Sequence, residues 1–138
     1  MDLIGAIVNH YVNGDESQAV ALRAALGTGK LIAGLGRQNR ARPYATVDEV
    51  DYDKIYECFG MSQRVESILV EFHIYSDTKA SLITLLDSFE DCYLNKNLSA
   101  DNMTILGQPT IEERMSYPEE DHWRGTIQFQ YNVQRALS

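Results

Sequence analysis

Residues 27–44, GTGKLIAGLGRQNRARPY, are the stretch whose residue types could bind phosphate, because they combine glycines with one lysine and three arginines. A P-loop requires Gly-x-x-x-x-Gly-Lys-Ser/Thr after a strand, so that backbone amides surround the phosphates and the hydroxyl binds magnesium. Here Gly29 and Lys30 are preceded by Ala24 where the first glycine should be, and followed by Leu31 where the hydroxyl should be. A dinucleotide fingerprint also lacks its third glycine. The stretch is therefore predicted to connect structural elements rather than to bind a nucleotide.

The other residues that could do chemistry are scattered. Three histidines fall on different predicted elements, without the pairing or the cysteine neighbours of a zinc site: His10, His73 and His122. Glu112 and Glu113 adjoin each other on a predicted strand, so they face opposite ways and do not form a paired acid and base. Neither Cys58 nor Cys92 has an evident base partner, and both are expected to be reduced thiols. We therefore expect a protein that is not an enzyme and that needs no metal or cofactor.

The charge of the 138-residue chain is acidic but uneven. A net charge of −8 opposes sequence-blind binding to nucleic acid, because that binding depends on cations. No acid occurs between Glu16 and Asp48, although five cations lie there: Arg23, Lys30, Arg37, Arg40 and Arg42. Residues 48–57, which follow, are rich in acids. Two unlike blocks of this kind could supply the two different patches of a head-to-tail ring interface.

Three helices are predicted from spacing and capping residues. Residues 2–12 place apolar side chains at helical intervals behind a capping Asp2, and residues 17–26 precede Gly27, which can adopt positive φ. In residues 78–94, after Asp77 as the expected cap, an apolar stripe recurs at helical spacing: Leu82, Leu85, Leu86, Phe89 and Tyr93. Asn95 and Asn97 are expected to end this helix.

Strands are predicted over residues 30–33, 44–52, 65–75, 103–116 and 127–134, with Gly107 and Pro109 splitting the fourth into two pieces. Residues 53–63 show no clear period and are predicted to be a long hairpin loop. The last strand alternates apolar residues with amides, and we expect its amide face to be free for docking. The element order predicts one α+β domain over residues 1–138, a mostly antiparallel sheet of about four strands with helices packed on one face.

The chain begins Met1-Asp2-Leu3 without a basic leader, and no apolar run approaches the length of a membrane span. We therefore expect a protein that is made in the cytoplasm and has no membrane partner.

Three segments resemble the tail terminator, or tail-completion, proteins of long-tailed bacteriophages. They are Arg42-Pro43-Tyr44 leading into a strand, the strand RVESILVEFHIYSD of residues 64–77 running directly into a helix, and the closing WRGTIQFQY of residues 123–131. The resemblance extends over roughly residues 1–135 in element order.

The resemblance implies a structural virion protein of the tail or neck, assembled in the host cytoplasm. Such a protein forms a sixfold ring with copies of itself, caps the tail tube protein, ends its polymerisation and joins the tail to the head connector, while DNA only passes through. Two regions would carry these contacts: the basic residues Arg37, Arg40 and Arg42, and the loop residues Asp53, Lys54, Tyr56, Phe59 and Met61. No catalytic residue is implied.

Two alternatives stay open at this point. One is another neck or head-completion component of similar size, and the other is a small ligand-binding or enzymatic α+β domain. A well-formed pocket with convergent polar groups would favour the second.

Overall fold

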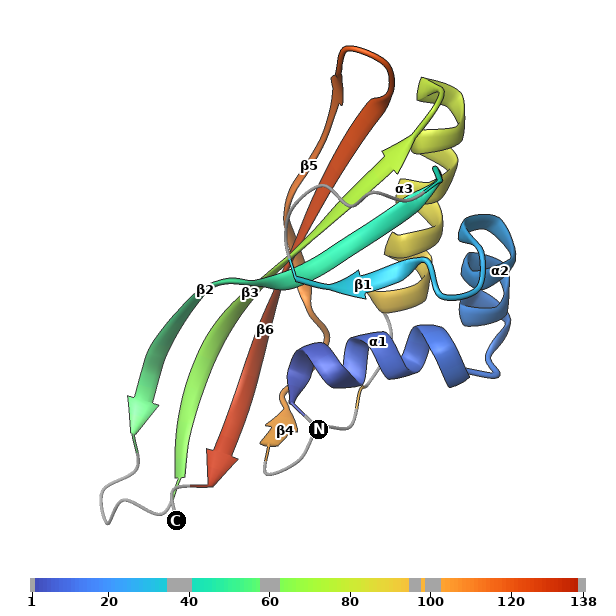
Figure 1. Cartoon of the computed structure of the whole chain (residues 1–138). Coiled ribbons are helices and arrows are strands. Elements are labelled where there is room, and N and C mark those ends of the chain that lie inside the picture. The colour runs from blue at the N-terminus through green and yellow to red at the C-terminus, as the bar shows by residue number, and fades with distance from the viewer. Residues whose placement is uncertain (1, 35–40, 58–62, 95–97, 99–102, 137–138) are drawn as a thin grey trace.

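The computed structural model describes residues 2–34, 41–57, 63–94, 98 and 103–136, and within these it describes no side chains at 52–57, 63–64 and 135–136. Three helices cover one face of a curved six-stranded sheet, which makes the fold α+β (Figure 1). The elements in chain order are α1 (Leu3–Asn13), α2 (Ser17–Leu26), β1 (Leu31–Ala33), β2 (Tyr44–Glu57), β3 (Gln63–Ser76), α3 (Lys79–Tyr93), β4 (Met103–Ile105), β5 (Thr110–Pro118) and β6 (Trp123–Ala136).

The sheet has the strand order β1-β2-β3-β6-β4, and β5 also pairs with β6. β1 is parallel to β2, whereas every other pairing is antiparallel. β4 and β5 lie beside successive parts of β6, since β4 pairs with residues 133–135 and β5 with residues 123–130. β6 therefore has a partner along both of its sides.

Capping side chains and a glycine set the ends of the helices. The Asp2 carboxylate accepts a hydrogen bond of 2.7 Å from the amide of Gly5, which confirms the predicted cap of α1. α2 ends before Gly27, whose φ of 115° confirms the expected positive φ. α3 is capped by Thr78, whose hydroxyl accepts from the amide of Ser81, so the prediction of Asp77 as the cap was wrong. Asn95 and Asn97 lie outside the described residues.

The core lies between the helices and one face of the sheet. The predicted stripe of α3 is buried throughout, and Phe89 and Tyr93 pack on Phe72 of β3 with ring centroids 5.1 and 5.2 Å away. Phe129 of β6 meets Phe72 edge-on at 5.7 Å. The apolar residues of the last strand therefore belong to the core, as their alternation with amides predicted.

Two sequence expectations need correction. The sheet has six strands rather than about four, because two short pieces, β1 and β4, add to its edges and β1 runs parallel to β2. Residues 53–57 and 63 belong to strands rather than to a hairpin loop, while residues 58–62 lie outside the described residues. The split of residues 103–116 into two strands is confirmed, and the second of them, β5, continues to Pro118.

Candidate functional site

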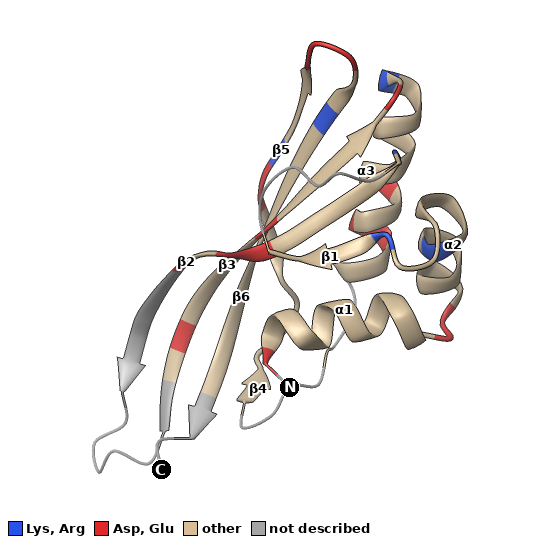
Figure 2. Cartoon of the chain, viewed as in Figure 1, with Lys and Arg blue, Asp and Glu red and all other residues tan. Residues whose placement is uncertain are grey.

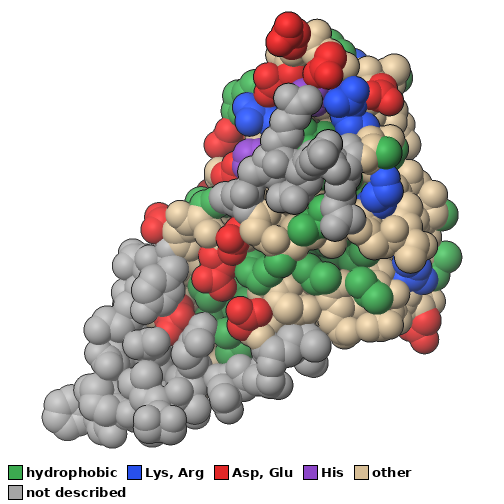
Figure 3. All heavy atoms as spheres, viewed as in Figure 1, with side chains coloured by type: hydrophobic (Ala, Val, Ile, Leu, Met, Phe, Trp, Pro, Cys, Tyr) green, Lys and Arg blue, Asp and Glu red, His purple; other side chains and the backbone are tan. Residues whose placement is uncertain are grey.

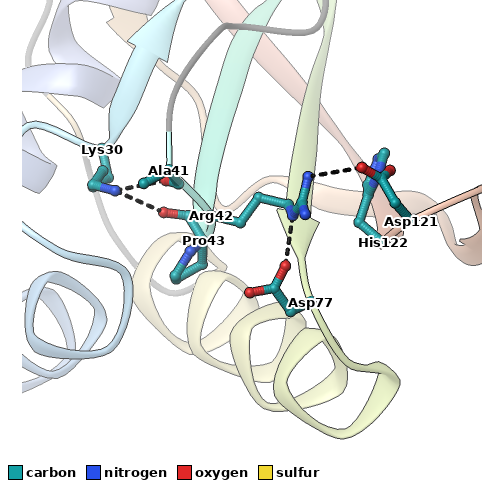
Figure 4. A network of polar contacts seen from close by, with 7 residues as sticks. All are labelled: Lys30, Ala41, Arg42, Pro43, Asp77, Asp121 and His122. Atoms are coloured by element: carbon teal, nitrogen blue, oxygen red, sulfur yellow. Dashed lines mark hydrogen bonds and ion pairs between the residues drawn. The ribbon is translucent and has the colours of Figure 1, made fainter.

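Arg42, one of the predicted contact residues, holds three separate segments together (Figure 4). Its Nε lies 2.6 Å from Oδ1 of Asp77, just before α3, and its Nη1 lies 3.7 Å from Oδ2 of Asp121, in the β5–β6 turn. The other oxygen of Asp121 lies 2.6 Å from Nδ1 of the buried His122. The hydrogen bond to Asp77 is the main reason that the pKa of Arg42 rises above its ordinary value. We call Arg42, Asp77, Asp121 and His122 the Arg42 cluster.

Two further cations of the basic segment also make internal contacts. Lys30 donates to the carbonyl oxygens of Ala41 and Pro43, at 2.7 and 3.4 Å (Figure 4). Arg23 donates to backbone carbonyl oxygens at the C-terminal end of α1, those of Tyr11, Val12 and Gly14. The other two of the five cations, Arg37 and Arg40, lie outside the described residues.

The second predicted contact region falls on a projecting arm of the sheet. The C-terminal half of β2, the N-terminal half of β3 and the end of β6 run together beyond the helices (Figure 1). Asp53, Lys54 and Tyr56 lie on β2 in this arm, and Lys54 pairs in register with the fully buried Glu66. Phe59 and Met61 lie outside the described residues. We call residues 52–57, 63–69 and 130–136 the arm.

The amide face of β6 is largely engaged within the sheet. Gln128 donates to Oε2 of Glu71 at 2.7 Å, and Gln130 donates to the hydroxyl of Ser67 at 2.5 Å. The other oxygen of Glu71 lies 2.6 Å from Nε2 of His73. These side chains therefore stabilise the strand pairing of β3 with β6, and the exposed Asn132 is the amide on this face most open to a partner.

A hollow that the sequence did not predict lies on the described surface, along α1. An open groove of about 470 Å³ runs along α1 beside β1, and its lining is Asp2, Ile4, Gly5, Val8, Asn9, Val12, Asn13 and Ala33. Hydrophobic side chains form a band over α1 and β1 (Figure 3). The sequence signal was present, because Ile4, Val8 and Val12 recur every four residues beside the stripe that faces the core. We call this hollow the α1 groove.

The charged side chains of the described residues gather in a few places on the surface. Acidic positions gather at the β5–β6 turn, on α3 and across the middle of the sheet (Figure 2). No group of three or more histidine, cysteine or acidic side chains among the described residues could hold a metal ion. Within the same part of the chain, no helix is long and apolar enough to cross a membrane.

The comparisons with known proteins agree with this architecture. No family model matches the chain, and no curated protein matches it in sequence. Its fold is similar to that of a chain in the solved structure "Virion of native gene transfer agent (GTA) particle", with a TM-score of 0.65. The two chains are 13% identical, and the alignment covers 99% of this chain and 96% of the other. The likeness therefore shows that this chain has the fold of a virion component over nearly its whole length.

Proposed function

We propose that this protein is a structural virion protein that forms a ring on the end of a phage tail tube, stops the growth of the tube and joins the tail to the head connector. The observation that supports this most directly is the fold likeness to a chain of the gene transfer agent virion, because it extends over 99% of this chain. The protein would act by binding alone, and its partners would be its own copies, the tail tube protein and the connector.

The shape and surface chemistry support an assembly role. A closed ring needs two different patches on each subunit, and the chain presents a projecting arm and, separately, an apolar groove on α1. The net charge of −8 also suits a ring through which DNA slides, since a negative surface does not hold its phosphates.

The test is to purify the protein and measure its mass and shape. Mass photometry should show a species of several copies, six according to the resemblance, and negative-stain images should show small rings. Tail tubes of the same phage that are incubated with the protein should carry a ring at one end and stop lengthening. A protein that stays monomeric at all concentrations and never decorates tubes would contradict the proposal.

Another neck or head-completion role is the alternative that shares the same supporting fold likeness. The two roles differ in the partner, because a terminator binds the tube end, whereas a head-completion component binds the connector. Binding of the purified protein to connectors but not to tubes would favour the alternative.

A further inference from the structure

The curved sheet has two long strand edges with which no described segment pairs. One is the side of β5 that faces away from β6, along the 9 residues Thr110–Pro118. The other is the side of β2 that faces away from β3 over residues 48–57, because β1 and Gly34 pair with β2 only as far as Val47. Each edge presents a row of backbone N–H and C=O groups that can pair with another strand, and the two rows are of nearly equal length.

The hydrogen bonds of the β5–β6 turn show which backbone groups of β5 face its free edge. The amide of Glu119 donates to the carbonyl of His122 at 2.8 Å and closes the turn. Bonded and non-bonded residue pairs alternate from there along the ladder, so the pair of Ser116 with Gly125 is a non-bonded one. The N–H of Ser116 therefore points to the free edge. Pro118, which has no N–H, occupies another such position and leaves the ladder with β6 complete.

On β2 the outward direction is set by the contact with the end of β1. The amide of Gly34 donates to the carbonyl of Val47 at 2.8 Å, on the side away from β3. Because the backbone direction alternates along a strand, Glu49 also faces outward. Its amide is bonded to the carboxylate of Asp48 at 2.8 Å. This carboxylate shields the start of the free edge in a single chain, as edge strands of natural proteins require.

The registers place the two edges at different heights in the sheet. Arg114, in the middle of β5, pairs with Ile127 of β6. Tyr52, in the middle of the free part of β2, lies level with Tyr131 of β6 through its pairing with Ile68 of β3. The two edges are thus offset by about four residues, from 127 to 131, across the four strands β5, β6, β3 and β2. A stagger of about one residue per strand is the one that closes an eight-stranded α/β barrel, in which the strands tilt by about 36°.

We propose that the free edge of β5 in one copy pairs with residues 48–57 of β2 in the neighbouring copy, so that the sheets of all copies join into one closed barrel. This inference depends on the ring of the proposed function and names the two edges that close it. β2, β3, β6 and β5 are antiparallel in turn, so the new pair is antiparallel as well. The two edges are different patches, which makes the contact head-to-tail, and closure leaves neither edge exposed.

The helix layer decides which face of such a barrel lines the channel. The three helices cover one face of the sheet, so this face lies outside, where the helices do not fill the channel (Figure 1). The opposite face carries Glu71, Gln128 and Gln130, an acidic and amide surface that does not hold phosphates. Barrels of about 8 strands are filled by side chains, whereas about 16 strands leave an aqueous channel. With four strands from each copy, the ring therefore needs at least about four copies.

The first test compares two substitutions of Ser116. Ser116→Pro removes the outward N–H and leaves the bonds to β6, because an edge strand tolerates proline where the N–H faces away from the sheet. Ser116→Ala removes the same hydroxyl and keeps the N–H. Ser116→Pro should raise the protein concentration needed for half-assembly by about tenfold or more, whereas Ser116→Ala should stay within about twofold of the wild type. Unfolding midpoints from circular dichroism check that both variants are folded.

Hydrogen exchange of the wild type identifies the second edge without any variant. On assembly, the outward amides of residues 49–57 and those of Arg114 and Ser116 should exchange about tenfold more slowly or less. Peptides from α2, which lies away from both edges, should exchange as in the single chain. If Ser116→Pro does not fold, this measurement decides alone.

Two results would overturn the inference and leave the proposed function intact. In the first, the wild type forms rings and Ser116→Pro forms them as well as Ser116→Ala does, which excludes the edge of β5. In the second, rings form but residues 49–57 gain no protection, which excludes β2 as the partner strand. A wild type that forms no ring would overturn both the inference and the proposed function.

Discussion

Arg42 shows how one side chain can be charged and accessible and still serve the fold. It lies in the basic segment, yet its guanidinium is held by Asp77 and Asp121, from two other parts of the chain. We therefore expect its replacement to act on stability first and on assembly only indirectly.

Replacing Arg42 with Met should lower the thermal unfolding midpoint, because the start of β2, the N-terminus of α3 and the β5–β6 turn lose their common partner. Added salt should narrow the difference from the wild type, since the ion pair is partly exposed. Scanning calorimetry of Arg42→Met, Asp77→Asn and the double variant measures the coupling between the two side chains. Strictly additive effects would mean that the pair contributes nothing.

The buried tyrosines should make the protein sensitive to alkali. Burial raises the pKa of Tyr11 from 10.0 to about 12, and it also raises the pKa of Tyr93 and of Tyr131. Because the unfolded chain loses these protons first, stability is full below pH 10 and falls as the pH rises towards the folded pKa values.

Tyr11→Phe should make the decline in stability above pH 10 less steep. The free energy of unfolding of the wild type should fall more steeply than that of the variant, by up to about 1.4 kcal/mol per pH unit. Urea titrations at a series of pH values between 8 and 11 give both slopes, with the loss of the hydrogen bond to the carbonyl of Gly27 as a constant offset. Parallel slopes would show that Tyr11 does not titrate with unfolding.

At the scale of elements, α3 is capped by Thr78, whereas the sequence predicted Asp77 as its cap. Asp77 and Thr78 are neighbours with similar capping preference, so the sequence cannot choose between them. The choice is made by Arg42, which is distant in sequence and binds Asp77.

Thr78→Ala should destabilise the protein by about 1 kcal/mol, because the amide of Ser81 loses its acceptor. Thr78→Ser keeps the hydroxyl and serves as the control. Urea unfolding followed by circular dichroism gives both values. Equal stability of Thr78→Ala and Thr78→Ser would show that the cap hydroxyl has no net effect.

The strand predicted over residues 44–52 continues to Glu57, and the register of β2 explains why the sequence did not show this. Its pairing with β3 shifts between Glu49 and Asp51 and again between Lys54 and Tyr56. Each extra residue inverts the alternation of β2 relative to β3, so the strict two-residue period that identifies a strand in a sequence is interrupted. β6 has no such shift against β3 between residues 123 and 136, and its alternation could be read from the sequence.

The α1 groove was missed for a different reason. The periodicity of residues 2–12 predicted the helix correctly, but a helical pattern does not state which of two adjacent apolar stripes the rest of the chain will cover. That choice is made by how the rest of the chain packs on α1, which leaves Ile7 fully buried and Val12 49% exposed.

At the scale of the whole molecule, the five cations between Glu16 and Asp48 fall into two groups. Three of them make contacts within the chain, and two lie outside the described residues. Arg23, Lys30 and Arg42 stabilise this chain, whereas Arg37 and Arg40 are the candidates for contact with a partner. Replacing Arg37, Arg40 and Arg42 together would therefore change both the stability of the chain and its contacts with a partner.

The double change Arg37→Glu and Arg40→Glu should weaken ring formation or head joining and leave the unfolding midpoint unchanged. Analytical ultracentrifugation measures ring formation, and calorimetry measures the unfolding midpoint. Arg42→Met is the matched control, for which we expect a lower midpoint and ring formation that is little changed. Normal assembly of the double variant would exclude these two residues from the interface.

The place of β6 in the sheet also bears on the fate of incomplete chains. β6 is the last strand of the order, and β3, β4 and β5 all pair with it. Until β6 has been synthesised, those three strands lack their common partner and α3 lacks one of the strands on which it packs. A product whose translation stops before residue 123 lacks the strand that β3, β4 and β5 share, so it can complete neither the core nor the arm.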